Sequence, residues 1–256
     1  MKRNSTDTDQ AFAGSGETIR SAIQRIVMTR TRCWLIAVTL LAGLAAGVMT
    51  TAGVPAADLT FAILSEPVQS LMSVTVPFLG VLLVGDLRRT VGPAWIMPSL
   101  LAAILLAAAI GLFGVLVSAV ALAITSPGSA PGPWLNAGTI AVGGVLVQIV
   151  AQLVGTGLGL LLRSPVVASL ATIVLPLGLW LVLGGVEILR PAQAWLTPYS
   201  SVRNLLSGQM SVMTWTQWLA VVLIWCVGLN VMGAVRLKRS RSGHALASEG
   251  SHDSER

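Results

Sequence analysis

One glycine-rich segment, Gly155-Thr156-Gly157-Leu158-Gly159, has a spacing that could cradle the phosphates of a nucleotide. That chemistry needs a strand before the glycines and a βαβ unit around them. Here apolar residues flank the segment, in a run long enough to cross a bilayer. Gly155 and Gly159 also form a GxxxG pair, which lets two membrane helices approach closely. We therefore interpret the segment as a site of helix packing.

A second segment, Leu206-Ser207-Gly208-Gln209, matches the signature tetrapeptide of ATP-binding-cassette ATPases. Those enzymes also need a G-x-x-x-x-G-K-[ST] phosphate loop, and this sequence has none. The segment also falls in a predicted outer loop, away from cytosolic ATP. We interpret the match as coincidental, so this chain is not expected to bind nucleotide.

Residues for catalysis or metal binding are missing from the apolar part of the sequence. His244 and His252 both lie in the polar C-terminal tail, and Cys33 and Cys226 lie in or beside apolar runs. An intramembrane metalloprotease or a Ser–His hydrolase needs a buried His, so we expect no enzyme activity, cofactor or metal. Ion-coupled transporters keep ionisable groups at membrane depth, and no predicted span has one in its middle. Energy for any transport is therefore expected from another polypeptide.

Polar residues do occur within two apolar runs. Gln148, Gln152 and Thr156 are spaced at i, i+4 and i+8, so they share one face of a predicted helix with Gly155 and Gly159 nearby. This face could line a substrate path, or its side chains could form hydrogen bonds between helices. We favour the second alternative. The apolar run at about 68–85 contains a further polar set: Gln69, Ser70, Ser73 and Thr75.

The composition is that of an integral membrane protein. Hydrophobic residues make up 54% of the 256 residues and charged residues 10%, whereas soluble domains have about 25% charged residues. The mean hydropathy of +0.81 reflects the long apolar runs, and the net charge of +6 is explained by basic residues that flank them. We expect an all-α fold in the lipid bilayer and no nucleic-acid partner.

Six spans are predicted, because a helix needs about 20 apolar residues to cross the hydrocarbon core. They fall at about 33–53, 68–85, 98–124, 137–162, 166–186 and 217–237. A basic amphipathic helix is predicted over 17–32, before the first span, within one transmembrane domain that covers 17–237. Residues 1–16 and 238–256 are polar and predicted to be disordered. The long outer loop, residues 187–216, is expected to form short helices at the membrane interface.

The lysines and arginines predict the orientation of these spans. All of them except Arg190 and Arg203 precede the first span, follow the last, or lie in the turns after the second and fourth spans. The positive-inside rule then places both termini in the cytosol. We expect a multi-pass protein of the plasma membrane.

The turn after the second span is a short charged segment with Asp86, Arg88, Arg89 and Thr90. Two arginines could simply hold a plain turn at the cytosolic face. The segment could instead be a contact for a soluble partner, and this is the interpretation we favour. We call these four residues the handle.

The order of these features resembles a permease subunit of an ATP-binding-cassette exporter with the type-two membrane fold. In the segment from Gly155 to Pro165, a glycine-bearing span ends in a Leu-Arg-Ser turn and a proline begins the next span, which contains Pro176. The stretch Trp195-Leu196-Thr197-Pro198 resembles the outer loop of that family, and residues 17–32 resemble its elbow helix.

The resemblance implies a function for the handle. In this family the corresponding loop forms a coupling helix that docks on the ATPase subunit, which implies that Asp86, Arg88, Arg89 and Thr90 form the coupling contact. The sequence has Asp86 where a Glu is usual. The implied partners are a separate ATPase subunit and a second permease, either another copy or a related chain, and the implied activity is export. The alternative is a membrane scaffold or immunity-type protein that transports nothing.

Overall fold

The computed structural model describes residues 30–90, 96–125 and 132–236, with the backbone alone at residues 86–90, 96 and 97. These residues form helices joined by short turns, and no strand occurs among them. Six of the helices are long and apolar enough to cross a membrane. The prediction of an all-α membrane protein with six spans is confirmed.

The first five spans are single helices, and the sixth is composite. The first five are α2 (Arg30–Gly53), α3 (Phe61–Thr90), α4 (Ile96–Thr125), α5 (Ala137–Leu161) and α6 (Pro165–Gly185). The predicted outer loop has three short elements: η2 (Glu187–Leu189), α7 (Arg190–Leu196) and α8 (Pro198–Leu206). The sixth span, Val212–Arg236, starts as α9 (Val212–Val222) and continues through the π-helical turn η3 (Leu223–Gly228). We call the whole of it the α9 span.

The predicted boundaries differ most at α3, which extends past residues 68–85 at both ends. Its start was predicted at Val68, seven residues after its first residue in the structure, Phe61. In the structure Pro67 lies inside the helix, and exposed Glu66 belongs to α3 and not to a loop. Membrane helices tolerate internal proline when neighbouring groups compensate for the lost bond.

The N-terminal prediction falls mostly outside the part of the chain that the structure describes. Of the predicted elbow helix, 17–32, only Arg30 to Arg32 are described, and they form the first turn of α2. These three residues therefore belong to the first span and not to a separate helix. The predicted disordered segments, 1–16 and 238–256, also lie outside the described residues.

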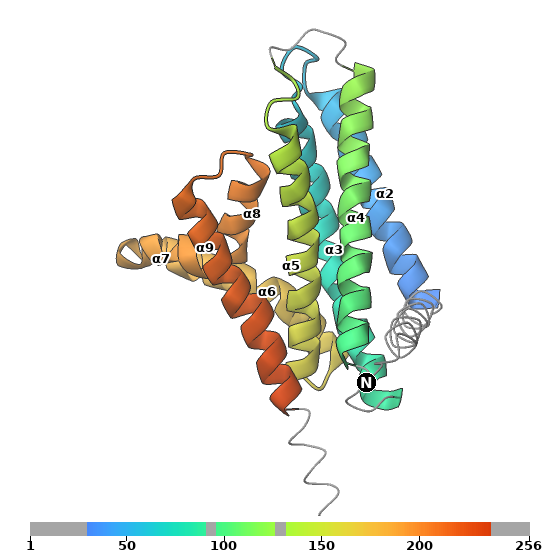
Figure 1. The fold of residues 1–256 in the computed structure, drawn as a ribbon, viewed down its shortest axis with the longest axis vertical. Coiled ribbons are helices and arrows are strands. Elements are labelled where there is room, and N and C mark those ends of the chain that lie inside the picture. Colours follow the sequence, from blue (N-terminus) through green and yellow to red (C-terminus); the bar gives the residue numbers. More distant parts are fainter. Residues whose placement is uncertain (1–29, 91–95, 126–131, 237–256) are drawn as a thin grey trace, which may run out of the picture.

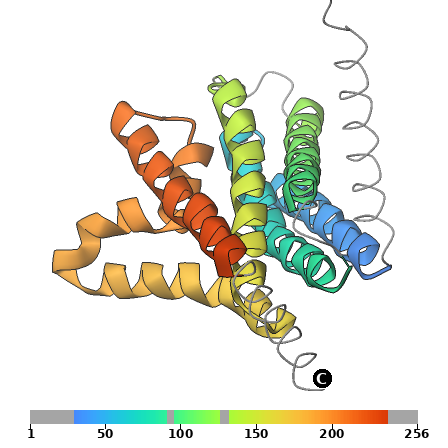
Figure 2. The ribbon, with the colours of Figure 1, turned by 60° about the horizontal axis from the view of Figure 1, so that its bottom comes forward.

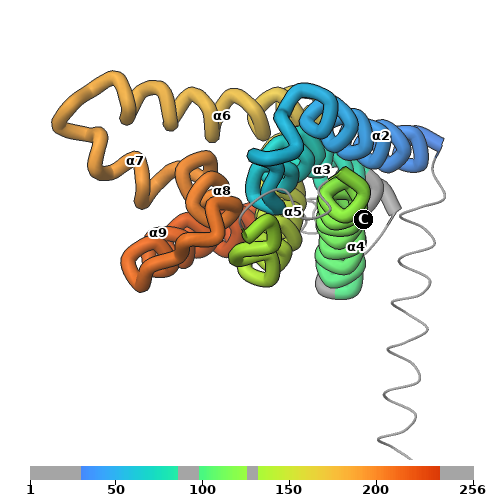
Figure 3. The backbone as a smooth tube through the Cα atoms, turned by 90° about the horizontal axis from the view of Figure 1, so that it is seen from above, coloured from blue at the N-terminus to red at the C-terminus, as the bar shows by residue number. Residues whose placement is uncertain are grey.

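The six spans form two regions (Figure 1). Helices α2, α3, α4 and α5 run side by side as a bundle, and α3 and α5 make the most extensive contact of any described helix pair. Helix α6 leaves this bundle sideways, and α7, α8 and the α9 span return towards α5 (Figures 2 and 3). We call α2–α5 the bundle and α6 to the end of the α9 span the arm.

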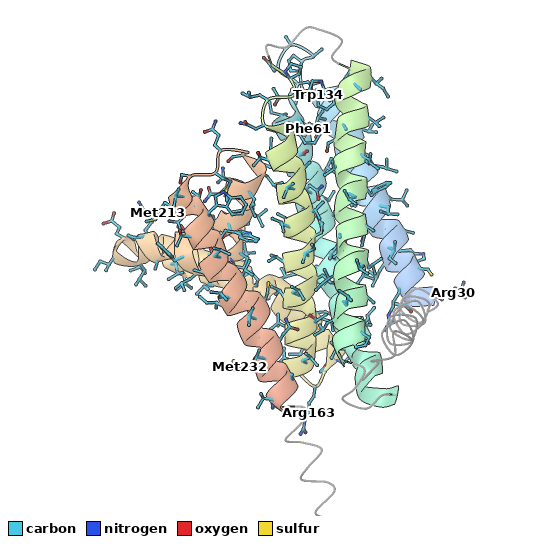
Figure 4. All side chains as sticks on the ribbon, in the orientation of Figure 1. Arg30, Phe61, Trp134, Arg163, Met213 and Met232 are labelled. Atoms are coloured by element: carbon cyan, nitrogen blue, oxygen red, sulfur yellow. The ribbon has the colours of Figure 1, made fainter. Side chains whose placement is uncertain are left out.

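The two ends of the molecule differ in residue type (Figure 4). Arg30 and Arg163 lie at one end, and Phe61 and Trp134 at the other. The rings of Phe61 and Trp134 stack with centroids 5.9 Å apart, and the Phe61 N–H donates to the Pro133 carbonyl at 2.9 Å. Arginine at one end and stacked aromatic rings at the other fit two different membrane interfaces.

Candidate functional site

Helices α3 and α5 approach through glycine and proline. A Cβ at Gly155 would overlap the carbonyl group of Pro77, and one at Gly159 would lie 3.1 Å from the Cα of Val81. From the other side, a Cβ at Gly80 would lie 2.7 Å from the carbonyl oxygen of Gln152. The structure therefore places both members of the GxxxG pair against α3, where only a hydrogen fits.

Three buried amide side chains join the same two helices. The Nε2 of Gln148 donates to Oε1 of Gln69 at 2.8 Å and to its carbonyl oxygen at 3.0 Å. Gln69 in turn donates from Nε2 to the carbonyl of Gly111 on α4 at 3.0 Å. When the Gln152 amide is oriented so that it bonds both the Val76 carbonyl and the Gly80 N–H, it donates to the Val76 carbonyl at 2.8 Å. These bonds tie α3, α4 and α5 together inside the bundle. The sequence showed Gln69 as polar but gave no sign that Gln148 is its partner.

Thr156 makes a different contact, from the bundle to the arm. Its hydroxyl donates to Oδ1 of Asn230 on the α9 span at 3.0 Å. Asn230 donates from Nδ2 to the carbonyls of Cys226 at 2.7 Å and Leu153 at 2.8 Å. Cys226 lies in the π-helical turn, and its carbonyl also accepts from the backbone N–H of Leu229. Sequence reasoning missed Asn230; its amide in the middle of an apolar span was the available signal.

A pocket of about 350 Å³ lies where the bundle meets the arm. Its lining comes from α3, α5, α6 and α8, and it includes the hydroxyls of Ser70, Ser73, Thr172 and Tyr199. On α5 the lining residues are Val147, Val150, Ala151 and Val154. Gln148, Gln152 and Thr156 therefore face helix neighbours, and the pocket lies beside the next face of α5.

The short helix α7 is held to other parts of the arm by two hydrogen bonds, and α8 by a ring contact. The Nε1 of Trp225 donates to the carbonyl of Leu196 at 2.8 Å. The Nε2 of Gln193 donates to the carbonyl of Trp180 on α6 at 2.9 Å. The ring of Tyr199, which lines the pocket, packs edge-on against Trp180 with centroids 5.0 Å apart. Helix α8 therefore forms one wall of the pocket.

The segment Leu206–Gln209 forms the turn that ends α8. Gly208 has φ +70°, a left-handed conformation that favours glycine. A Cβ at Gly208 would lie 2.8 Å from the Cβ of Asn136. The turn itself accounts for this glycine, in keeping with the interpretation of the tetrapeptide as a coincidence.

At the arginine-bearing end, the handle continues α3. The backbone of Asp86, Arg88, Arg89 and Thr90 is helical, so these residues form the last turns of α3 and not a loop; their side chains lie outside the described part. One turn earlier, the Leu82 carbonyl accepts a hydrogen bond of 2.8 Å from Nη2 of Arg32.

Arg32 is a residue whose placement sequence reasoning missed. It was predicted as one of several arginines of an interfacial helix, yet its side chain is 3% exposed. Leu82 lies eight residues before the end of α3, so this bond reaches a carbonyl inside the helix. Arg236 is different, since it donates from Nη1 to the Leu161 carbonyl at the end of α5 at 3.0 Å, where cations stabilise carbonyls that lack helical partners.

The described residues include no group of three or more His, Cys, Asp or Glu that could hold a metal ion. Of the two cysteines, Cys33 is exposed and Cys226 is buried in the α9 span. Comparison of the sequence with models of known protein families, and with curated proteins, gives no match.

Proposed function

We propose that this chain is the permease subunit of an ATP-binding-cassette exporter, and that it moves a substrate outward with ATP hydrolysed by a separate subunit. The observation that supports this most is the continuity of α3. One helix carries Ser73 and Pro77 at the pocket and ends in Arg88 and Arg89 of the handle. The rise of a helix puts about 16 Å between Pro77 and Arg88. A push on the handle therefore reaches the pocket through one rigid element.

The two regions supply the parts that such a motion needs. The amide bonds from Gln148 and Gln152 and the glycine contact at Gly155 fix α3 to α5. Helix α6 is held less firmly, because few of its side chains are buried. Docking of the ATPase would move α3 and α5 as a body relative to α6 and so change the shape of the pocket. Rigid-body shifts of this kind are common in switching proteins.

The complete transporter would pair this chain with a second permease, either another copy or a related chain. Two ATPase subunits would bind the two handles from the cytosol, where both termini lie. In this proposal the protein resides in the plasma membrane and binds no nucleotide itself.

The experiment is a charge reversal at the handle. The double variant Arg88→Glu, Arg89→Glu, produced in native membranes, should lower co-purification of the ATPase subunit by about tenfold or more, since reversed charges repel a complementary surface. The matched control is Arg190→Glu, Arg203→Glu, which reverses two exposed arginines on α7 and α8. The control should co-purify the ATPase as the parent chain does.

Full ATPase binding and transport by the handle variant would contradict the coupling role and leave the plain-turn interpretation. Co-purification with the unmutated parent chain tests the alternative of a scaffold or immunity-type protein. Such a protein would co-purify a partner that is not a nucleotide-hydrolysing subunit.

A further inference from the structure

The pocket between the bundle and the arm has two prolines in its lining, one on each side. Pro77 belongs to α3 and Pro176 to α6. Proline has no backbone N–H, so the carbonyl four residues earlier loses its helical partner. Those carbonyls belong to Ser73 and Thr172, and both of these residues also line the pocket. Two of the residues that line this cavity, one on each helix, thus have a backbone acceptor without its helical partner.

The hydroxyl groups in the lining add further acceptors. Ser73 donates its hydroxyl hydrogen to the Ser70 carbonyl at 2.7 Å. Thr172 donates to the Ser169 carbonyl at 2.7 Å. A hydroxyl that has given its one hydrogen still has lone pairs to accept with. At Ser73 and Thr172 the pocket is therefore rich in acceptors and short of donors.

Ser70 and Tyr199 also have hydroxyl groups, and the rest of the lining is apolar and uncharged among the residues that the structure describes. Val74, Val150, Ala151, Ile173 and Leu177 provide most of it. An anion would be repelled by carbonyl oxygens. A cation would leave water without a carboxylate to pair with, which is costly at membrane depth. The chemistry therefore selects a neutral ligand.

We propose that this pocket binds an uncharged, mainly apolar molecule that carries a hydroxyl or amide N–H group, whose hydrogen is donated to the carbonyl of Ser73 or Thr172. The volume of about 350 Å³ is at the lower end of the range for small-molecule sites. Helix α6 has only three buried residues, so the rest of the protein covers little of this wall of the pocket, and the ligand has a route from the bilayer beside it. Identifying this ligand with the exported substrate rests on the proposed function; the binding itself does not.

The test uses the full chain in phosphatidylcholine nanodiscs, without any ATPase, and two probes of nearly equal size. The first, 4-hydroxybiphenyl, donates one hydrogen bond, and the second, 4-methoxybiphenyl, donates none. Binding is measured by equilibrium dialysis, with empty nanodiscs to subtract partition into lipid. We expect saturable binding of the hydroxyl compound, about 3- to 10-fold tighter than that of the ether. Equal affinity of the two probes would overturn the proposal.

Three variants locate the site. The double variant Pro77→Ala, Pro176→Ala restores an N–H for both the Ser73 and the Thr172 carbonyl, so the preference for the hydroxyl compound should fall at least twofold. Pro67→Ala is the matched control: it restores an N–H in α3 for the carbonyl of Ile63, which does not line the pocket. Ala151→Phe fills the cavity and should abolish saturable binding, with thermal unfolding as the check that the variant folds. An unchanged preference in Pro77→Ala, Pro176→Ala, or saturable binding in folded Ala151→Phe, would overturn the proposal.

The outcomes also separate this inference from the proposed function. The handle variant Arg88→Glu, Arg89→Glu should bind 4-hydroxybiphenyl normally, since it leaves the pocket intact. Loss of ATPase binding with normal probe binding supports both proposals. Normal ATPase binding without donor-selective probe binding would overturn the ligand class alone.

Discussion

Helices α5 and α6 are consecutive spans joined by a turn at Ser164, yet they meet very different surroundings. In α5, 13 of 25 residues are buried, whereas α6 buries three of 21. Helix α6 is nevertheless the more apolar of the two. In a membrane, apolar character does not drive a helix inwards, because lipid is as apolar as leucine. Glycines and amides decide the position instead, and α5 carries both on the face towards α3.

The pocket lies on the border between these two kinds of surrounding. Its α3 and α5 walls belong to the bundle, fixed by Gly155 against Pro77 and by the pair of Gln69 and Gln148. Its α6 wall has no comparable amide pair among the described residues. A cavity with one firm side and one loosely held side can change shape without unfolding either part. This is the arrangement that alternating access requires.

The largest effect is expected where backbone meets backbone. Gly155→Val would force α5 away from the carbonyl of Pro77, and overpacking of this kind costs about 3 kcal/mol. The measurement is thermal unfolding in detergent micelles. Gly178→Val on α6 is the control, since a Cβ there meets no atom within 4 Å. Equal losses at the two positions would break the contrast between α5 and α6.

A smaller loss is expected for the buried amide pair. Gln148→Leu removes two hydrogen bonds and leaves Oε1 of Gln69 without this donor, which should cost about 1.5 kcal/mol. The exposed Gln209→Leu serves as control and should change stability little. In a double-mutant cycle with Gln69→Leu, the two losses should be strongly non-additive. Additive losses would show that the pair does not bind α5 to α3.

Within the arm, Trp225→Phe is expected to loosen α7 and α8. It removes the hydrogen bond to the Leu196 carbonyl, worth about 1 kcal/mol. Amide hydrogen exchange should quicken by about fivefold in these short helices and stay unchanged in α3. Trp215→Phe, at a partly exposed ring, is the comparison. Faster exchange in α3 as well would mean that the arm and the bundle open together.

The smallest effect is expected at the link between the two regions. Thr156→Val removes the hydroxyl that donates to Asn230 on the α9 span, and membrane hydrogen bonds average about 0.6 kcal/mol. Thermal unfolding in micelles would measure this loss of stability. The control is Met232→Leu, a change at a lipid-facing residue near Asn230, which should be neutral. A loss as large as that of Gly155→Val would show that the α9 span is part of the rigid bundle.

The sequence predicted the spans because length and apolar character are local properties. The predicted start of α3 was wrong, because Pro67 lies inside the helix, as membrane helices tolerate. The partner of Gln148 could not be predicted, because spacing along one helix says nothing about register against another. Arg32 looked like other basic residues until α3 was seen to place the Leu82 carbonyl beside it. The pocket was hidden for the same reason, since its two prolines are far apart in the chain and adjacent only in space.

The handle itself was visible in the sequence as a charged segment between apolar runs. A helical backbone there was implied only by the family resemblance, as a coupling helix in the loop after the second span, and its continuity with α3 was not predicted. In the structure α3 continues through Thr90, so the proposed ATPase contact lies at the end of a rigid helix and not in a loop. This continuity links the handle to the pocket in the proposed mechanism.

Site-specific crosslinking from the handle tests the proposed function most directly. A photoreactive amino acid placed at Arg88 in native membranes would be irradiated, and the attached polypeptide identified by mass spectrometry. A second label at Arg203 on α8 gives the background. We predict that position 88, and not position 203, crosslinks to a polypeptide with a G-x-x-x-x-G-K-[ST] phosphate loop. Crosslinks from position 88 to lipid alone, or to a protein without such a loop, would contradict the proposal.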